Sequence, residues 1–202
     1  MAIFSFHPVK HIATGEGGMI TTNNPDLYKK MKSLRSHGIT KDPDQLMKNH
    51  GGWYYEMQEL SHNFRLTDFQ AALGLSQLKR ADEGIRRRLE LALIYNRSFS
   101  GIEEIKTPVS TENSSHAYHL YIIEVPERKQ FYDYLRKQGI FAQIHYIPVH
   151  YMPYYKQFGW KKGDFPEAED YYEHCISIPM YPTLSNEEQT YVIEKVTDFF
   201  IS

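Results

Sequence analysis

Cysteine is almost absent from the sequence: Cys175 is the only one among 202 residues, which excludes a framework of disulfide bonds within the chain. An excess of basic charge is absent as well, because 23 Lys and Arg are balanced by 25 Asp and Glu, for a net charge of −2. No apolar run approaches the length of a membrane span, and the first seven residues lack the basic region and cleavage site of a signal peptide. We therefore expect a cytoplasmic protein that binds neither nucleic acid nor membrane.

Aromatic residues, by contrast, are abundant, with 16 Tyr and 11 Phe. Tyr combines apolar area with a polar tip, which suits surfaces that contact another subunit or a ligand. A Tyr-rich core and surface without such a role explains the composition equally well. The length suits one large domain or two small ones, and the chain is long enough to bury a real core.

Local patterns predict a hairpin and a helix at the start of the chain. Residues 2–6 and 19–22 are short runs rich in β-branched and aromatic residues, which predict two strands around a turn that contains Lys10. Asn24 is a good N-cap for a helix that Gly38 would end. The irregular segment that follows, up to residue 65, is rich in aromatic residues, so we expect a functional loop rather than disorder.

A capping box at residues 67–70 predicts one long helix to about Phe99, which we expect to connect two domains. Its expected apolar face comprises Leu78, Ala81, Ile85, Leu89 and Ala92. After Gly101 the pattern is that of a compact α+β domain. Its expected elements are strands at 118–125 and 141–146 and helices at 127–138 and 167–175, with a terminal helix after a capping box at 185–188.

Lys10 is the first candidate catalytic residue. A Schiff-base lysine needs a backbone-fixed, deprotonated amine, and a tight turn between two strands supplies the fixed backbone. Ser5 lies five residues before it with a hydroxyl that could donate to an anion, and the glycine-rich run 15–18 lets backbone pass close to a ligand. By pattern alone, however, a lysine in a turn is more often a solvated surface residue.

The stretch around this lysine, FSFHPVKHIATGEGGMITTN, closely resembles the lysine signature of the DegT/StrS sugar aminotransferases, a fold-type-I family that uses pyridoxal 5'-phosphate. The resemblance implies that Lys10 forms the Schiff base with this cofactor and shuttles a proton between substrate and cofactor. It also implies that Ser5 binds the cofactor phosphate. The family's dehydratases have a histidine in place of the lysine, so Lys10 argues against that branch.

Two further blocks carry the resemblance. HNFRLTDFQAALG, at 62–74, is similar to the family block whose Asn reaches across a homodimer interface to the neighbouring cofactor phosphate, which implies this role for Asn63. Alternatively, Asn63 and Arg65 only organise a loop before a helix cap. QIHYIPVHYMPYY, at 143–155, is similar to a block that shapes the sugar-nucleotide pocket. The candidate substrate-binding residues are therefore Ser5, Asn63, Gln143, His145, Tyr146 and Ile147.

A metal site is not expected at the two histidines of the last block. His145 and His150 lie five residues apart across a proline, without a carboxylate or cysteine nearby. Structural and catalytic zinc sites need three or four such ligands. Pyridoxal 5'-phosphate, the cofactor that the resemblance implies, is thus expected without a metal ion.

The resemblance extends over essentially the whole chain and implies an α/β fold, the C-terminal part of a fold-type-I transferase with the end of its large domain, a long connecting helix and a small α+β domain. Residues 1–85 would be the remnant of the cofactor-binding large domain with the start of the long helix, and 86–202 the small domain. We expect the N-terminal half, with the aspartate that pairs with the pyridine nitrogen, to be missing. We therefore expect the chain alone to be inactive.

Three stretches, SFHPVKHIATGEGGM, RSHGITKDP and WYYEMQELSHNFRLTDFQAALGLSQLKR, together are most similar to UDP-4-amino-4,6-dideoxy-N-acetyl-beta-L-altrosamine transaminases of pseudaminic acid biosynthesis. The implied reaction transfers an amino group from L-glutamate to C4 of a UDP-linked 4-keto-6-deoxy-N-acetyl sugar. Two alternatives remain open: an aminotransferase for another nucleotide 4-keto sugar, and a non-catalytic dimerisation or interaction remnant.

Overall fold

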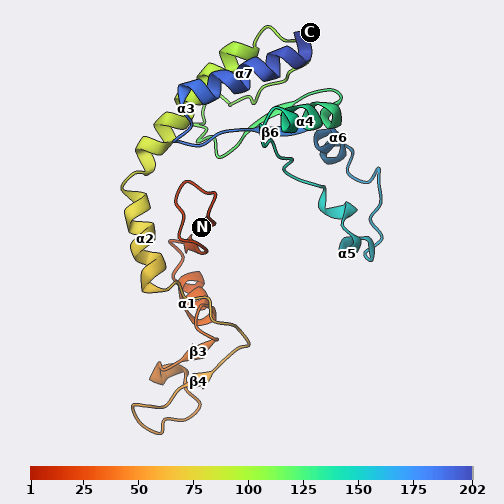
Figure 1. Cartoon of the computed structure of the whole chain (residues 1–202). Helices are drawn as coiled ribbons and strands as arrows, with labels where there is room; N and C mark the ends of the chain where they lie inside the picture. Colours follow the sequence, from red (N-terminus) through yellow and green to blue (C-terminus); the bar gives the residue numbers. More distant parts are fainter. Residues whose placement is uncertain (202) are drawn as a thin grey trace. The chain divides into compact units, whose positions relative to one another are not determined.

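The computed structural model describes residues 1–201 and divides into two compact units, Met1–Ala81 and Asp82–Ser202. We refer to them as the N-terminal unit and the C-terminal unit and describe each by itself (Figure 1). The expected domain division between residues 85 and 86 stays a prediction.

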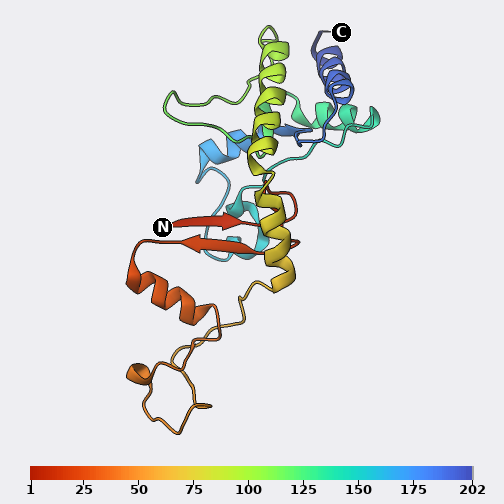
Figure 2. The ribbon, with the colours of Figure 1, turned by 90° about the vertical axis from the view of Figure 1, so that its left-hand side faces the viewer.

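The N-terminal unit opens with a two-stranded antiparallel hairpin. Strand β1 (Ala2–Ser5) pairs with β2 (Gly18–Thr21), and Figure 2 shows the two strands side by side. Helix α1 (Pro25–Leu34) follows, and the Asn24 side chain accepts hydrogen bonds from the first N–H groups of the helix. Both predicted strands and the predicted N-cap are confirmed.

The aromatic-rich loop after α1 is held by one carboxylate. Strands β3 (Ile39–Thr40) and β4 (Glu56–Met57) pair, with the short 3-10 helix η1 (Pro43–Gln45) between them. Glu56 accepts from the Met47 N–H at 2.7 Å and from the Tyr54 hydroxyl at 2.9 Å. These hydrogen bonds, led by that of Met47, lower the pKa of Glu56. The segment is therefore an ordered loop, as predicted.

The predicted continuous helix is wrong, because it is divided into α2 (Asp68–Leu78) and α3 (Ala81–Phe99). The capping box of Thr67 and Gln70 is present at the start of α2. At the break, the Arg80 N–H bonds to the Gln77 carbonyl, three residues back, so the ladder of bonds to the fourth residue back is interrupted. The apolar spacing continues through the break and therefore gave no sign of it.

The C-terminal unit is built on a second antiparallel pair, β5 (Tyr121–Glu124) with β6 (Cys175–Ile178). Its helices, besides α3, are α4 (Arg128–Lys137), α5 (Pro153–Lys156), α6 (Pro166–His174) and α7 (Asn186–Ile201), with the 3-10 helix η2 (Val149–Tyr151). The strand predicted at 141–146 is wrong: only an isolated bridge joins Gln143 to Ser177. Strand β6 was not predicted.

The buried apolar core lies in the C-terminal unit. Helix α3 contributes Leu91, Ala92, Tyr95 and Phe99, so four of the five residues of the predicted apolar face lie outside the buried set. Within the described N-terminal unit no apolar side chain is buried, and Phe69 is 91% exposed. The two units therefore differ in what stabilises them.

Tyr95 supplies a hydrogen bond inside this core, where its hydroxyl donates to the Pro179 carbonyl at 2.9 Å. The Tyr95→Phe variant is expected to lose about 1–3 kcal/mol in free energy of unfolding, because the partly buried Pro179 carbonyl loses its donor. Urea unfolding measures this loss. The matched control is Tyr191→Phe, whose exposed hydroxyl donates to Gln138. Equal losses in both variants would contradict the argument.

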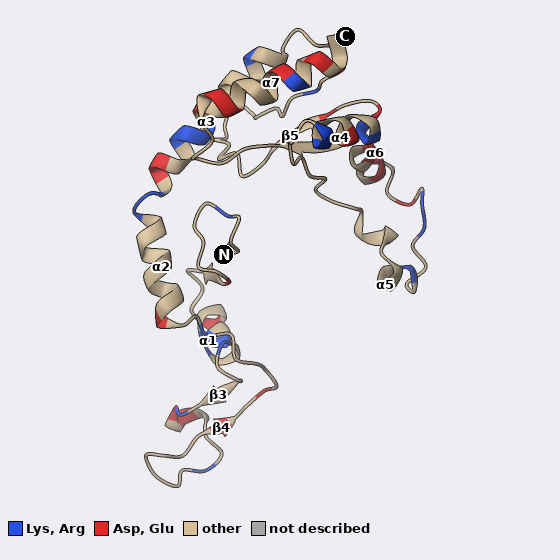
Figure 3. Ribbon diagram, viewed as in Figure 1, with Lys and Arg blue, Asp and Glu red and all other residues tan. Residues whose placement is uncertain are grey.

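Charges of both signs are mixed along the helices of the C-terminal unit, α3 and α7 among them (Figure 3). Among the described residues, no helix combines the length and the apolar character needed to cross a membrane.

Candidate functional site

Hydrogen bonds beyond the paired strands hold the turn that carries Lys10. The Phe6 N–H donates to the Gly17 carbonyl at 2.9 Å, and the Thr14 N–H donates to the Phe6 carbonyl at 3.0 Å. Within the turn, the Lys10 N–H donates to the His7 carbonyl at 2.9 Å. Lys10 is half-buried. Its backbone is therefore fixed, as a Schiff-base lysine requires.

Two glycines allow the hairpin to close this tightly. A Cβ on Gly18 would lie 2.8 Å from the Phe4 carbonyl oxygen. Gly17 has a φ of 148°, and a Cβ there would lie 2.6 Å from Thr14 Oγ1 and 2.8 Å from Leu66 Cδ1. The glycine-rich run thus serves close approach between protein segments, in addition to the approach to a ligand that the sequence suggests.

Helix α2 supports the same turn from its first residues. The Gln70 side chain donates to the Glu16 carbonyl at 2.8 Å, and Thr14 Oγ1 donates to the same carbonyl at 2.7 Å. Thr14 is the only buried polar side chain of the described N-terminal unit. Sequence reasoning assigned Gln70 only to the capping box and missed Thr14, because their link to the turn depends on tertiary packing.

Ser5 and Lys10 belong to the same hairpin, Ser5 at the end of β1 and Lys10 in the turn that follows. The Ser5 oxygen accepts from the His7 N–H at 3.4 Å, and a hydroxyl that accepts in this way keeps a hydrogen to donate. A hydroxyl suits a phosphate oxygen and a lysine amine suits an aldehyde carbon, so this donor set fits two ends of pyridoxal phosphate. The assignments of both residues stay predictions.

Asn63 lies elsewhere in the N-terminal unit, at an isolated bridge to Ser36 beyond the end of α1. Its side-chain oxygen accepts from the Arg65 N–H at 3.2 Å, so it does organise the loop before the α2 cap. Asn63 is exposed and is not part of the Lys10 hairpin. Its expected role at a neighbouring subunit's cofactor stays a prediction.

The other predicted residues form one short segment of the C-terminal unit. Gln143 exchanges two backbone hydrogen bonds with Ser177 of β6, and the Nδ1 atom of His145 lies 2.7 Å from Ser177 Oγ. Tyr146 is 69% and Ile147 45% exposed. The sequence did not identify Ser177 as the partner of this segment, because it predicted no strand at β6. The segment is thus anchored to Ser177 by hydrogen bonds, and it exposes Tyr146 and Ile147 to solvent.

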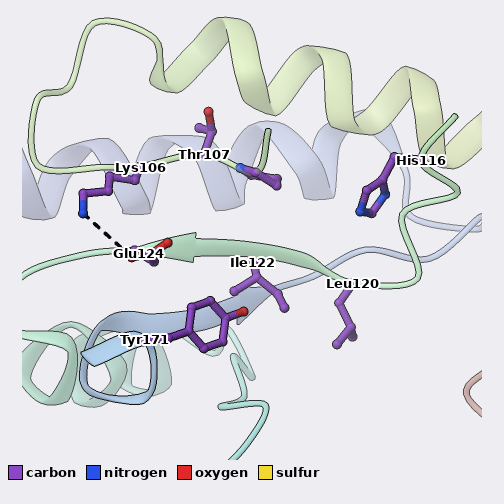
Figure 4. A pocket seen from close by; sticks show the side chains of 8 residues that line it. Lys106, Thr107, His116, Leu120, Ile122, Glu124 and Tyr171 are labelled. Carbon is purple, nitrogen blue, oxygen red and sulfur yellow. Dashed lines mark ion pairs between the residues drawn. The ribbon is translucent and has the colours of Figure 1, made fainter. Parts of the chain in front are cut away.

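A hollow of about 210 Å³ lies beside β5 in the C-terminal unit (Figure 4). It is lined by Lys106, Thr107, Pro108, His116, Leu120, Ile122, Glu124 and Tyr171. Lys106 and Glu124 form an ion pair of 3.9 Å, and the Lys106 side chain is 77% exposed. None of the predicted site residues lines this hollow, so it is distinct from the site that the sequence predicts.

Within residues 1–201, no group of three His, Cys, Asp or Glu side chains is arranged to hold a metal ion. His150 instead forms a buried pair with Glu169, its Nε2 atom 2.8 Å from the carboxylate. Cys175 is buried, and burial raises the pKa of its thiol.

Comparison with known families decides the membership. The profile of the DegT/DnrJ/EryC1/StrS aminotransferase family matches residues 1–197. The chain belongs to this family. Its α/β fold class is confirmed by the solved relatives, of whose chains it covers about half.

Two curated relatives illustrate the range of the family. The spore coat polysaccharide biosynthesis protein SpsC of Bacillus subtilis is 41% identical over 96% of this chain and 52% of its own. A UDP-4-amino-4,6-dideoxy-N-acetyl-beta-L-altrosamine transaminase of Helicobacter pylori is 36% identical over 100% of this chain and 52% of its own. The chain thus spans about half the length of the curated relatives it matches.

Two solved structures show the same fold. PseC of Helicobacter pylori, described as an aminotransferase involved in the biosynthesis of pseudoaminic acid, has a TM-score of 0.86 and 36% identity, covering 98% of this chain and 53% of its own. The sugar aminotransferase Spr1654 of Streptococcus pneumoniae in its PMP form has a TM-score of 0.85 and 34% identity, covering 96% and 51%.

Proposed function

We propose that this chain provides the lysine-bearing part of a pyridoxal-phosphate-dependent nucleotide-sugar aminotransferase. The observation that carries the proposal is the hydrogen-bonded hairpin that bears both Ser5 and Lys10, in a chain that belongs to the DegT/DnrJ/EryC1/StrS aminotransferase family. A related enzyme is described in forms with the phosphorylated pyridoxal and pyridoxamine cofactors, which supports the same cofactor here.

Each residue of the hairpin has a separate task. Lys10 would hold the cofactor covalently, and its amine would move a proton between the reacting substrate carbon and the cofactor. Ser5 donates its hydroxyl hydrogen to a phosphate oxygen and so fixes the other end of the cofactor. The bound cofactor supplies the electron sink that makes amino transfer feasible. Gln70 and Thr14, through the Glu16 carbonyl, keep the turn rigid.

We propose L-glutamate as the donor and C4 of a UDP-linked 4-keto-6-deoxy-N-acetyl sugar as the acceptor, as in pseudaminic acid biosynthesis. The Helicobacter pylori relative, named for a UDP-amino sugar, supports this choice. The proposed sugar-nucleotide contacts come from Gln143, His145, Tyr146 and Ile147. The higher identity to SpsC favours the second candidate, an aminotransferase for a different nucleotide sugar.

A homodimer, with Asn63 contributing to the neighbouring cofactor site, is part of the proposal. The N-terminal unit exposes large apolar side chains such as Leu60, Phe64 and Phe69, with exposed fractions of 85%, 65% and 91%. Exposed apolar surface of this kind needs cover from another protein surface. The remaining candidate, an interaction remnant without catalysis, rests on the same surface.

The reaction is tested by following nitrogen from ¹⁵N-labelled glutamate into the sugar by mass spectrometry. The chain is assayed with the cofactor, both alone and with the half of SpsC that it does not match. In the combined sample we expect at least about tenfold more label in the UDP-4-keto sugar than in its dTDP counterpart, a difference that a few nucleotide contacts supply. Equal labelling of the two sugars would favour the second candidate. Labelling of neither sugar would favour the third candidate, an interaction remnant without catalysis.

A further inference from the structure

The segment between Gln143 and Met152 in the C-terminal unit is irregular but anchored. At its start, Gln143 and Ser177 exchange backbone hydrogen bonds of 3.1 and 2.7 Å, and His145 adds its contact to the Ser177 hydroxyl. Ordering such a segment has an entropic cost for every residue that is fixed. A single anchor at the start leaves the later residues unrestrained, so a second one is needed further along.

The second anchor is a buried carboxylate on α6. His150 Nε2 lies 2.8 Å from Glu169 Oε1, and their side chains are only 7% and 9% exposed. A carboxylate offers only acceptors, so the His150 Nε2 atom carries the hydrogen of this bond. The ring of His150 also packs on that of Phe165, with centroids 4.8 Å apart. His150 is thus held by both polar and apolar contacts.

The Glu169 carboxylate also holds a second loop, which contains Gly163 and Phe165. It accepts the Gly163 N–H with oxygen distances of 2.8 and 2.9 Å, and the Phe165 N–H at 3.4 Å. Burial by itself would raise the pKa of Glu169, but the hydrogen bonds from Gly163 and His150 outweigh it and hold this pKa at about 2. Glu169 therefore stays ionised at neutral pH and ties two loops to α6.

Between the anchors, the chain points apolar side chains outward. Tyr146, Ile147 and Val149 are 69%, 45% and 59% exposed. Side chains that are exposed in this way do not hold their own backbone in place, because they gain no burial energy from doing so. Pro148 between them is buried, so the positions of these three exposed side chains depend on the anchors at either end and on Pro148.

We propose that Glu169 is a positioning residue, which through His150 and the Gly163–Phe165 loop fixes residues 146–149 in the shape that meets the substrate. The identity of the substrate rests on the proposed function, whereas the clamp itself does not. Loss of the clamp should loosen these two loops and leave the β5–β6 core intact.

Hydrogen exchange of the full chain, followed by peptide mass spectrometry, tests the clamp without any ligand. Glu169→Ala is expected to speed exchange at least about tenfold in both 145–151 and 159–165, with less than about threefold change in β5. His150→Ala should open only the first loop, because Gly163 and Phe165 still bond to Glu169. Glu169→Gln should stay close to the parent, since its amide keeps one accepting oxygen.

The matched control is Glu167→Ala, which removes an exposed carboxylate from the same first turn of α6. Unchanged exchange in Glu169→Ala, or a uniform increase that includes β5, would overturn the proposal. A second measurement tests the effect on substrate binding. Calorimetry with UDP-N-acetylglucosamine should show that Glu169→Ala binds this probe about tenfold more weakly than the parent chain. A parent chain that does not bind this probe counts against the proposed substrate class, while the exchange pattern still decides the clamp.

Discussion

Lys10→Ala is expected to abolish the borohydride-stable link between the protein and pyridoxal phosphate, and with it amino transfer. The hairpin holds the backbone of Lys10 in a fixed place, and no neighbouring lysine shares this turn. Loss of the proton-moving role alone lowers turnover about 10²–10⁴-fold, and loss of covalent attachment adds to this. Reduction with borohydride followed by peptide mapping locates the modified lysine, and ¹⁵N transfer from glutamate measures turnover.

The control for this experiment is Lys30→Ala. Lys30 is exposed and pairs with Glu59, so its removal should leave both the link and the turnover unchanged. The chain is mapped together with the half of SpsC that it does not match, because it spans about half of the relatives' length. A dominant link at a lysine other than Lys10 in that sample would show that the assignment is wrong.

Local elements of the fold were predictable because their signals are local. Asn24 and the pair Thr67–Gln70 cap helices through side chains within three residues of the cap, so the sequence alone reveals them. The break after Leu78 left no such signal, because neither glycine nor proline marks it and the apolar spacing runs on. Strand β6 was missed because it is only four residues long and follows directly on helix α6, so its short Ile-Ser-Ile run gave no clear strand pattern.

In the candidate site, too, only the features with local sequence signals were predictable. Lys10 and Ser5 lie close in sequence, so a motif can reveal them together. Ser177 and Glu169 lie 32 and 19 residues from the histidines that they hold, and only the fold brings these partners together. A motif therefore identifies the residues that face a ligand more readily than the residues that orient them.

The distribution of buried residues gives the two units different roles. The C-terminal unit has its own core, in which the rings of Phe131, Phe199 and Phe200 pack with centroids about 5 Å apart. The N-terminal unit carries the reactive lysine but buries no apolar side chain among its described residues. Stability of the chain by itself should therefore depend on the C-terminal core.

Phe131→Ala is the strongest test of this dependence. Phe131 is fully buried on α4 against α7, and its removal leaves a cavity that the packed strands and helices fill only in part. The expected loss is about 3–5 kcal/mol in free energy of unfolding, with a fall in Tm of roughly 10–20 °C, measured by urea and thermal unfolding. The matched control is Val109→Ala, at a side chain that is 90% exposed, where the change should stay within about 0.5 kcal/mol. Similar losses in the two variants would mean that the C-terminal core is not what stabilises the chain.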